Sequence, residues 1–132
     1  MSFQEIAIFL DGPCGQLEAR YQNNPQATGL ALLCHPNPAQ GGSMLNKVLS
    51  TLQRAARDVG FSTLRFNYRG VGASVGHHCL NEGEVDDAEA ALNWLCLQQP
   101  DLPVTLLGFS FGGYVAASLA LRLSARSEDL HH

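Results

Sequence analysis

Hydrophobic positions along the chain alternate between short continuous runs and runs spaced for one face of a helix. Segments 3–10 and 16–21, joined by a turn-rich stretch, predict an antiparallel hairpin. The next run, 28–34, is apolar throughout, which is typical of a strand covered on both faces, although a short buried helix has the same pattern. Further strands are expected at 61–66 and 103–107.

Three helices are expected between and after these strands. One spans 43–59 with Ser43 available as N-cap, and a second spans 85–99. The third, 111–124, is apolar almost all round, which indicates burial between the sheet and something else. A hairpin followed by alternating strands and helices predicts an α/β fold with a mostly parallel sheet and right-handed crossovers, forming one domain over 1–132.

Composition narrows the range of partners. The chain has 8 Lys+Arg against 12 Asp+Glu, a net charge of -4, and no basic cluster, so a nucleic-acid partner is not expected. It has no basic amino-terminal region and no apolar run of the ~18 residues that a membrane span requires, so a cytoplasmic protein is expected. The cysteines, which lie far apart, are expected to be reduced thiols: Cys14, Cys34, Cys79 and Cys96.

The pentapeptide 108–112, Gly-Phe-Ser-Phe-Gly, matches the pattern G-x-S-x-G at the junction of a predicted strand and a predicted helix. This is the setting of a nucleophile elbow, a tight turn that projects the serine hydroxyl, here Ser110, above the sheet. The backbone N–H of Phe111 would then form one half of an oxyanion hole. A glycine-rich strand-to-helix turn with a capping serine is the alternative interpretation.

The loop 34–42 is the candidate for the second half of that hole. Neither Pro36 nor Pro38 has a backbone N–H, so Asn37 is the only donor between them, and the flanking prolines would stiffen it. An ordinary proline-rich connection has the same composition. The interpretation therefore depends on its pairing with the serine turn.

Five segments together resemble the small bacterial α/β-hydrolase proteins related to dienelactone hydrolases and short esterases: 35–38 (HPNP), 41–44 (GGSM), 65–74 (RFNYRGVGAS), 83–87 (GEVDD) and 108–114 (GFSFGGY). The resemblance extends from about Phe3 to Leu121. It implies a strand order 1-2-4-3-5 with the first strand antiparallel, a nucleophile on Ser110, and oxyanion donors matching Asn37 and Phe111.

The resemblance also exposes a gap. In this fold the catalytic acid and histidine follow the serine, on loops after later strands. Only residues 111–132 remain after Ser110, and they leave no strand to carry either group. The leading hypothesis is the amino-terminal part of a serine hydrolase that takes a small ester or related acyl substrate. The rival is a truncated, non-catalytic module that forms a homodimer through the exposed edge of the 103–107 strand.

The histidines offer few alternatives for the missing base. His35 matches a family position that is read as structural, and His131-His132 could be a piece of an expression tag. His77 and His78 lie after the fourth strand, on the side where ligands gather, and depart from the family position of the base. A metal site that uses them with Cys79 is not expected, because adjacent ligands do not converge on one ion.

The remaining charged and glycine-rich segments have structural interpretations. Glycines at 70, 72 and 76 miss the G-x-G-x-x-G spacing, so no nucleotide cofactor is expected. The acidic residues before and within the second helix are interpreted as first-turn residues that favour a helix N-terminus: Glu82, Glu84, Asp86 and Asp87. Arg69 could anchor the loop near the active site, although an ion pair is the preferred interpretation.

Overall fold

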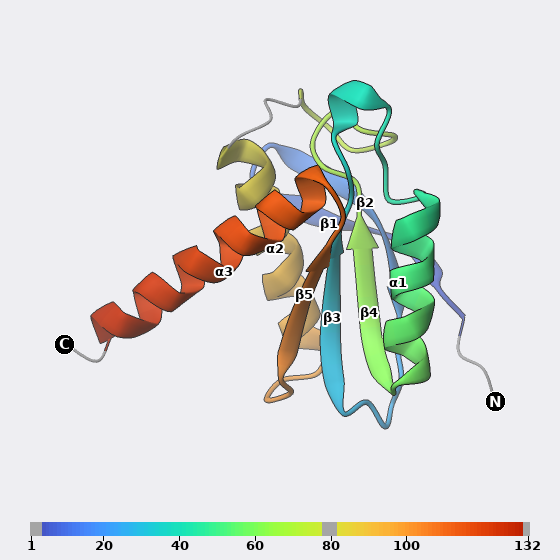
Figure 1. Cartoon of the computed structure of the whole chain (residues 1–132), viewed down its shortest axis with the longest axis vertical. Helices are drawn as coiled ribbons and strands as arrows, with labels where there is room; N and C mark the ends of the chain where they lie inside the picture. Colours follow the sequence, from blue (N-terminus) through green and yellow to red (C-terminus); the bar gives the residue numbers. More distant parts are fainter. Residues whose placement is uncertain (1–3, 78–81, 131–132) are drawn as a thin grey trace.

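A mixed sheet with the strand order β1-β2-β4-β3-β5 lies at the centre of the computed structural model, which describes residues 4–77 and 82–130 (Figure 1). The elements in chain order are β1 (Ile6–Gly12), β2 (Gly15–Gln22), β3 (Gly29–Cys34), the short 3₁₀ helix η1 (Pro38–Gln40), α1 (Lys47–Asp58), β4 (Phe61–Phe66), α2 (Glu82–Gln98), β5 (Val104–Gly108) and α3 (Phe111–Leu130). The predicted α/β class and strand order are confirmed.

Strand directions refine one expectation. β3 pairs in parallel with both β4 and β5, whereas β2 pairs antiparallel with both β1 and β4. Among the described strands, the first is therefore antiparallel to its one partner, as expected, but β2 is the strand that runs against the other four. The hairpin is also tighter than predicted, because β1 continues to Gly12 and leaves only Pro13 and Cys14 between the strands.

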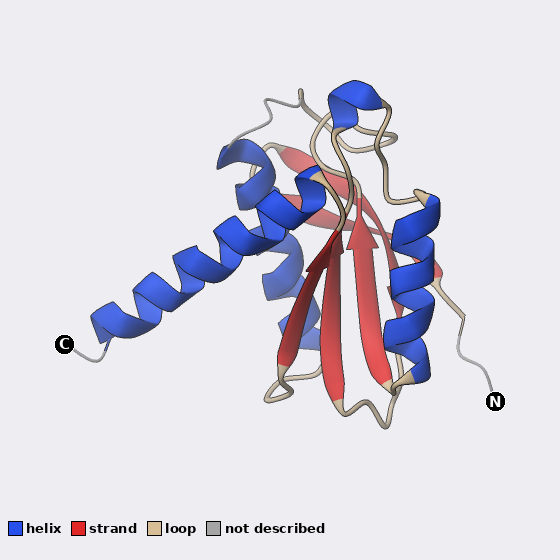
Figure 2. Cartoon of the chain, viewed as in Figure 1, coloured by secondary structure: helices blue, strands red, loops and turns tan. Residues whose placement is uncertain are grey.

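Helices cover both faces of the sheet (Figure 2). α1 packs on one face over Ala31 and Leu33, while α2 and α3 pack on the other, where Leu30 and Leu32 contribute to the larger core. All residues of β3 are buried, which confirms that its continuous apolar run is a strand enclosed on both faces. This burial fixes the carboxyl end of β3, from which the loop to η1 departs.

The predicted start of the first helix is wrong. α1 begins at Lys47, and Asn46 is its N-cap, with Oδ1 accepting the backbone N–H of Val48 at 2.9 Å. The backbone N–H of Met44 is instead bound by Asn67 Oδ1 at 2.8 Å. The carbonyl oxygen of Met44 accepts a hydrogen bond from Arg65 Nη1 at 2.8 Å. The N–H of Val48, which would bind that oxygen in a helix begun after Ser43, binds Asn46 instead, so Ser43 caps nothing in α1.

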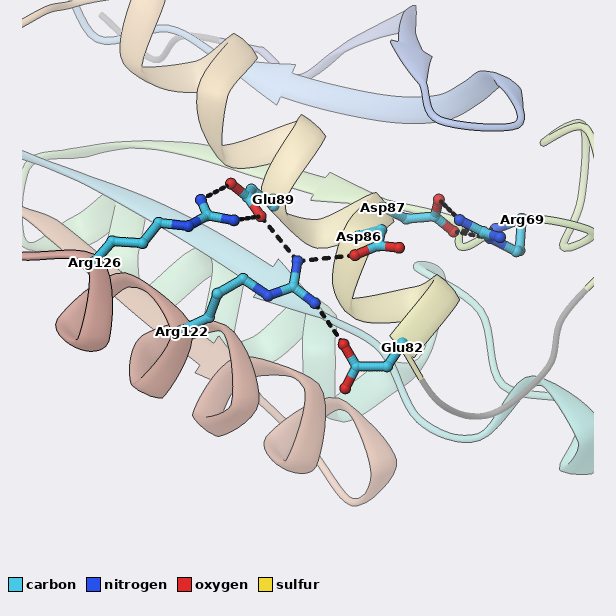
Figure 3. Close-up of polar contacts among 7 residues, drawn as sticks. All are labelled: Arg69, Glu82, Asp86, Asp87, Glu89, Arg122 and Arg126. Atoms are coloured by element: carbon cyan, nitrogen blue, oxygen red, sulfur yellow. Dashed lines mark hydrogen bonds and ion pairs between the residues drawn. The ribbon is translucent and has the colours of Figure 1, made fainter. Parts of the chain in front are cut away.

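The last two helices are joined by ion pairs (Figure 3). Arg122 of α3 contacts Glu82 at 2.7 Å and both Asp86 and Glu89 at 2.8 Å, and Arg126 also pairs with Glu89. These contacts explain why α3 runs to Leu130 rather than ending at 124. No helix within the described ranges is long and apolar enough to cross a membrane.

Candidate active site

A two-residue connection joins β5 to α3. Gly108 ends the strand and Phe111 begins the helix, so the direction of the chain changes at Phe109 and Ser110. Ser110 adopts φ 60°, a left-handed conformation that is uncommon for residues other than glycine and marks local strain. The residue is exposed to solvent. The predicted position of Ser110 at a tight strand-to-helix turn is thus found in the structure.

Two glycines make this turn sterically feasible. A Cβ at Gly108 would lie 2.2 Å from the carbonyl oxygen of Gly112, and a Cβ at Gly112 would lie 2.0 Å from the carbonyl oxygen of Cys34. Real Cβ atoms do not approach backbone atoms so closely, so both positions require glycine. The first turn of α3 consequently packs directly on the end of β3.

The loop after β3 is folded on itself around Asn37. The side-chain Oδ1 of Asn37 accepts the N–H of Ala39 at 2.8 Å, and its carbonyl oxygen accepts N–H groups from Gln40 at 3.1 Å and Gly42 at 2.9 Å. Gly42 packs closely on the start of the loop, where a Cβ would meet the carbonyl oxygen of Pro36 at 2.2 Å. These contacts hold Asn37 in one conformation.

The loop and the serine turn enclose one pocket of about 260 Å³, lined by Pro36, Asn37, Gln40, Gly41, Gly42, Asn46, Phe109 and Ser110. Two of the three predicted site residues, Asn37 and Ser110, therefore share a pocket, and Phe111 follows in sequence at the helix start. Within the described residues, no intramolecular acceptor is found for the backbone N–H of Asn37 or of Phe111. Both N–H groups are therefore unpaired within the described structure.

His35 is buried directly below this pocket. Its Nδ1 lies 2.7 Å from the carbonyl oxygen of Pro36, and its Nε2 accepts the backbone N–H of Tyr68 at 3.3 Å. Burial lowers the pKa of His35 to about 4, so the ring is neutral near pH 7. Because both ring nitrogens are engaged, His35 is not placed to accept a proton from Ser110.

No other described histidine serves that purpose either. His77 is exposed, and in the described part of the chain no histidine is hydrogen-bonded to Ser110. His78, Cys79 and the terminal pair His131-His132 lie outside the described residues. Among residues 4–77 and 82–130, no group of three or more His, Cys, Asp or Glu is placed to hold a metal ion.

The described cysteines, Cys14, Cys34 and Cys96, are free thiols as predicted. Cys34 is buried at the end of β3, and burial raises the pKa of its thiol to about 12. A thiol with this pKa stays protonated near neutral pH and is a poor nucleophile. Ser110 is therefore the better-placed candidate in this part of the molecule.

Asp87 was misassigned by the sequence pattern. It lies beyond the first turn of α2, is fully buried, and binds Arg69 with Oδ1···Nη2 of 2.9 Å and Oδ2···Nε of 3.1 Å. The ion pair expected for Arg69 is thereby confirmed, and it ties the loop after β4 to α2. Of the acidic residues, only Glu82 and Glu84 are in the first turn.

Tyr68 and Asn67 were not singled out from the sequence. Asn67 Oδ1 holds the N–H of Met44, and the Tyr68 hydroxyl donates to the carbonyl oxygen of His35 at 2.9 Å. Both residues directly follow β4, next to the carboxyl end of β3. Their position could have indicated a place near the site, because ligands bind beyond the carboxyl ends of parallel strands and both residues are polar or aromatic.

Comparisons with known proteins place this geometry in a family. Residues 31–127 match the alpha/beta hydrolase fold family. The uncharacterized protein RP471 of Rickettsia prowazekii is 43% identical over 118 residues, which cover 87% of this chain and 49% of RP471.

Two solved structures are also similar. An a/b serine hydrolase without lid from Xanthomonas campestris has a TM-score of 0.84 and 38% identity, covering 94% of this chain and 59% of that one. An alpha-beta serine hydrolase homologue from Coxiella burnetii has a TM-score of 0.81 and 39% identity, covering 91% of this chain and 58% of the homologue. The chain thus spans about half the length of these relatives. On the fold, the serine turn and these matches, the chain belongs to the alpha/beta hydrolase fold family.

Proposed function

We propose that the chain is part of a serine hydrolase that acts on a small ester or related acyl substrate through an acyl-enzyme on Ser110. The observation that carries this proposal is the left-handed turn at Ser110, which opens onto a pocket shared with Asn37. A strained serine at a strand-to-helix junction is the arrangement that presents a nucleophile. Similarity to serine hydrolases along most of the chain supports the same reaction class.

In the proposed reaction, Ser110 Oγ attacks the carbonyl carbon of the substrate. The π electrons move to the carbonyl oxygen, and the N–H groups of Asn37 and Phe111 donate hydrogen bonds to the resulting oxyanion. The start of α3 adds the positive end of a helix dipole at the same place. Loss of one such donor typically raises the reaction barrier by about 3 kcal/mol.

The proton of Ser110 must pass to a general base. In the alpha/beta hydrolase fold that base is a histidine oriented by an acid, and both follow the serine in the chain. We propose that these groups are supplied by residues that follow this segment in a longer protein, in keeping with the half-length match to its relatives. Without them, the serine hydroxyl is a weak nucleophile.

An activity-based probe tests the nucleophile. A fluorophosphonate should label the longer protein rapidly at Ser110, and Ser110→Ala should abolish labelling, while the exposed Ser124→Ala should label normally. The 132-residue chain alone should label slowly. Labelling of the longer protein at another residue would refute the role of Ser110, and rapid labelling of the short chain would refute the proposed location of the base.

A second candidate function, non-catalytic self-association, is favoured by the outer face of β5 and α3. The ion pairs turn Arg122 and Arg126 toward α2 (Figure 3), which leaves small and apolar side chains on the outside of the helix. Leu121 is 73% exposed there. An apolar groove of about 380 Å³ runs beside it, lined by Leu106, Leu107, Gly108, Gly113, Ala116, Ala117 and Ala120.

Under this second proposal, two copies of the 132-residue chain pair through the free edge of β5. Among the described strands, β5 pairs only with β3, so its other edge has unused backbone donors and acceptors. The residues that line the groove are uncharged, so the contact itself would bring no like charges together, although each copy carries a net charge of -4. Sedimentation velocity tests it, since a monomer that persists at high concentration without aggregation would contradict this pairing.

A further inference from the structure

Tyr68 lies between the two segments that carry the proposed oxyanion donors. The residue is fully buried, its hydroxyl donates to the carbonyl oxygen of His35 at 2.9 Å, and its backbone N–H donates to His35 Nε2 at 3.3 Å. The Tyr68 ring centroid is 4.1 Å from that of His35 and 5.8 Å from that of Phe111, which it meets edge to face at 83°. One side chain therefore contacts both sides of the site.

His35, which Tyr68 holds, is linked to Asn37 through a single peptide unit. Because Nε2 of His35 accepts a hydrogen bond, the neutral ring carries its proton on Nδ1, which donates to the carbonyl oxygen of Pro36 at 2.7 Å. That carbonyl and the N–H of Asn37 belong to the same planar, trans peptide. Fixing the carbonyl fixes the direction of the N–H, and the hydrogen bond also polarises the peptide so that the N–H becomes a stronger donor.

The other donor is held by packing. The half-buried ring of Phe111 rests against Tyr68 on one side and Tyr114, at 5.8 Å, on the other. Edge-to-face aromatic contacts have a preferred geometry, so the Tyr68 ring restricts where the start of α3 can lie. Burial also raises the pKa of Tyr68, so its hydroxyl remains a donor throughout the pH range in which proteins work.

We propose that Tyr68 is a positioning residue that holds both oxyanion donors in one arrangement, the N–H of Asn37 through His35 and the N–H of Phe111 through ring contact. This inference rests on the proposed function, because it assumes that these N–H groups stabilise an oxyanion. Tyr68 itself touches no substrate. Its loss should therefore weaken binding of a tetrahedral adduct without removing the nucleophile.

The first test needs no activity. Residual dipolar couplings measured on the 132-residue chain report the direction of each backbone N–H. Tyr68→Phe removes the hydroxyl bond to the carbonyl oxygen of His35, keeps the backbone N–H bond to Nε2, and should change the coupling of Asn37. Tyr21→Phe removes a hydroxyl bound to Asn23 Oδ1 at 3.0 Å elsewhere in the fold and should leave that coupling unchanged. An unchanged coupling at Asn37 in Tyr68→Phe would overturn the proposal.

A second variant covers the case in which Tyr68→Phe does not fold. Phe111→Leu keeps every hydrogen bond of Tyr68 and His35 and removes only the ring contact. It should change the N–H coupling of residue 111 and leave that of Asn37 in place. If the coupling of residue 111 is unchanged, the ring contact does not position this donor and the proposal is wrong.

The second test uses the longer protein, which supplies the proposed base, with a short alkyl trifluoromethyl ketone at equilibrium, followed by ¹⁹F NMR. Ser110 Oγ bonds to the carbonyl carbon, the π electrons move to the oxygen, and the hydroxyl proton leaves to solvent, so the adduct carries the charge that the two donors would hold. Tyr68→Phe should weaken the adduct about fivefold, the effect of one ordinary hydrogen bond, with Tyr21→Phe unchanged.

The outcomes separate the two proposals. Equal affinity in the unmodified longer protein and its Tyr68→Phe variant would overturn the positioning role. If the longer protein forms no more adduct than its Ser110→Ala variant does, the proposed function fails instead. In that case the dipolar couplings still decide whether Tyr68 orients the N–H of Asn37.

Discussion

The adjacent glycines at the start of α3 test how closely this helix approaches β3. A Cβ at Gly112 would lie 2.0 Å from the carbonyl oxygen of Cys34 and 2.7 Å from that of His35, whereas the nearest atom to a Cβ at Gly113 is the carbonyl oxygen of Gly108 at 3.8 Å. The first contact is impossible without movement, and the second is ordinary van der Waals contact. Alanine should therefore have opposite effects at the two positions.

The size of the difference follows from two effects. Replacing glycine by alanine within a helix stabilises it by up to about 1 kcal/mol, which applies at both positions. At Gly112 the added methyl group meets backbone atoms that cannot rotate away, so the first turn of α3 must shift by about 1 Å or more. Overpacking of this kind costs about 1–3 kcal/mol. The gain from alanine cancels between the two positions, so we expect Gly113→Ala to be as stable as the unmodified chain or more so, and Gly112→Ala to lie about 1–3 kcal/mol below Gly113→Ala.

Thermal unfolding followed by circular dichroism measures the gap. For a chain of this length, about 1–3 kcal/mol corresponds to a difference of roughly 3–10 °C in Tm between the two variants. Gly112→Ala should also disturb the turn at Ser110, which immediately precedes the displaced helix. Equal Tm values would show that α3 does not contact the end of β3 as described, and the geometry of the site would have to be redrawn.

Three further predictions concern stability and association. Because burial lowers the pKa of His35 to about 4, the unfolded chain binds a proton between pH 4 and 6.5 that the folded chain does not. The free energy of unfolding should therefore be constant above about pH 6.5 and fall by about 3 kcal/mol as the pH drops to 4. Urea denaturation at several pH values measures this fall, which should be absent in His35→Phe. Asn46→Ala should lower the free energy of unfolding by about 1 kcal/mol while Asn46→Asp, which keeps a capping oxygen, should not, and equal losses in urea denaturation would contradict its capping role. If the chain self-associates through the free edge of β5, Ala120→Glu, in the groove between β5 and α3, should shift sedimentation toward monomer, whereas Leu97→Glu, at a 76% exposed position on α2, should not.

The pattern of apolar positions was sufficient to predict the elements and their class, because β3 and its neighbours are encoded by local runs of buried residues. It failed where a distant contact decides a local choice. Ser43 and Asn46 are both good capping residues, and the choice between them goes with contacts that hold Met44 from Asn67, 23 positions away, and from Arg65. The extra turns of α3 similarly depend on acidic partners in α2.

The candidate site divides in the same way. The turn at Ser110 and the loop at Asn37 are visible in the sequence because glycine and proline mark them directly. The proposed role of Tyr68 is not visible in the sequence, because it depends on hydrogen bonds to His35, which lies 33 positions earlier. The catalytic roles of Ser110, Asn37 and Phe111 remain predictions that only chemistry can test.

The central claim is that Ser110 forms a covalent acyl intermediate. Mass spectrometry of the longer protein, quenched in acid during turnover of an activated acetyl ester, tests this most directly. We expect one acetyl group, on the peptide that contains Ser110, and none in Ser110→Ala. Continued turnover with no acylated peptide, or acetylation at a different residue that tracks the rate, would contradict it.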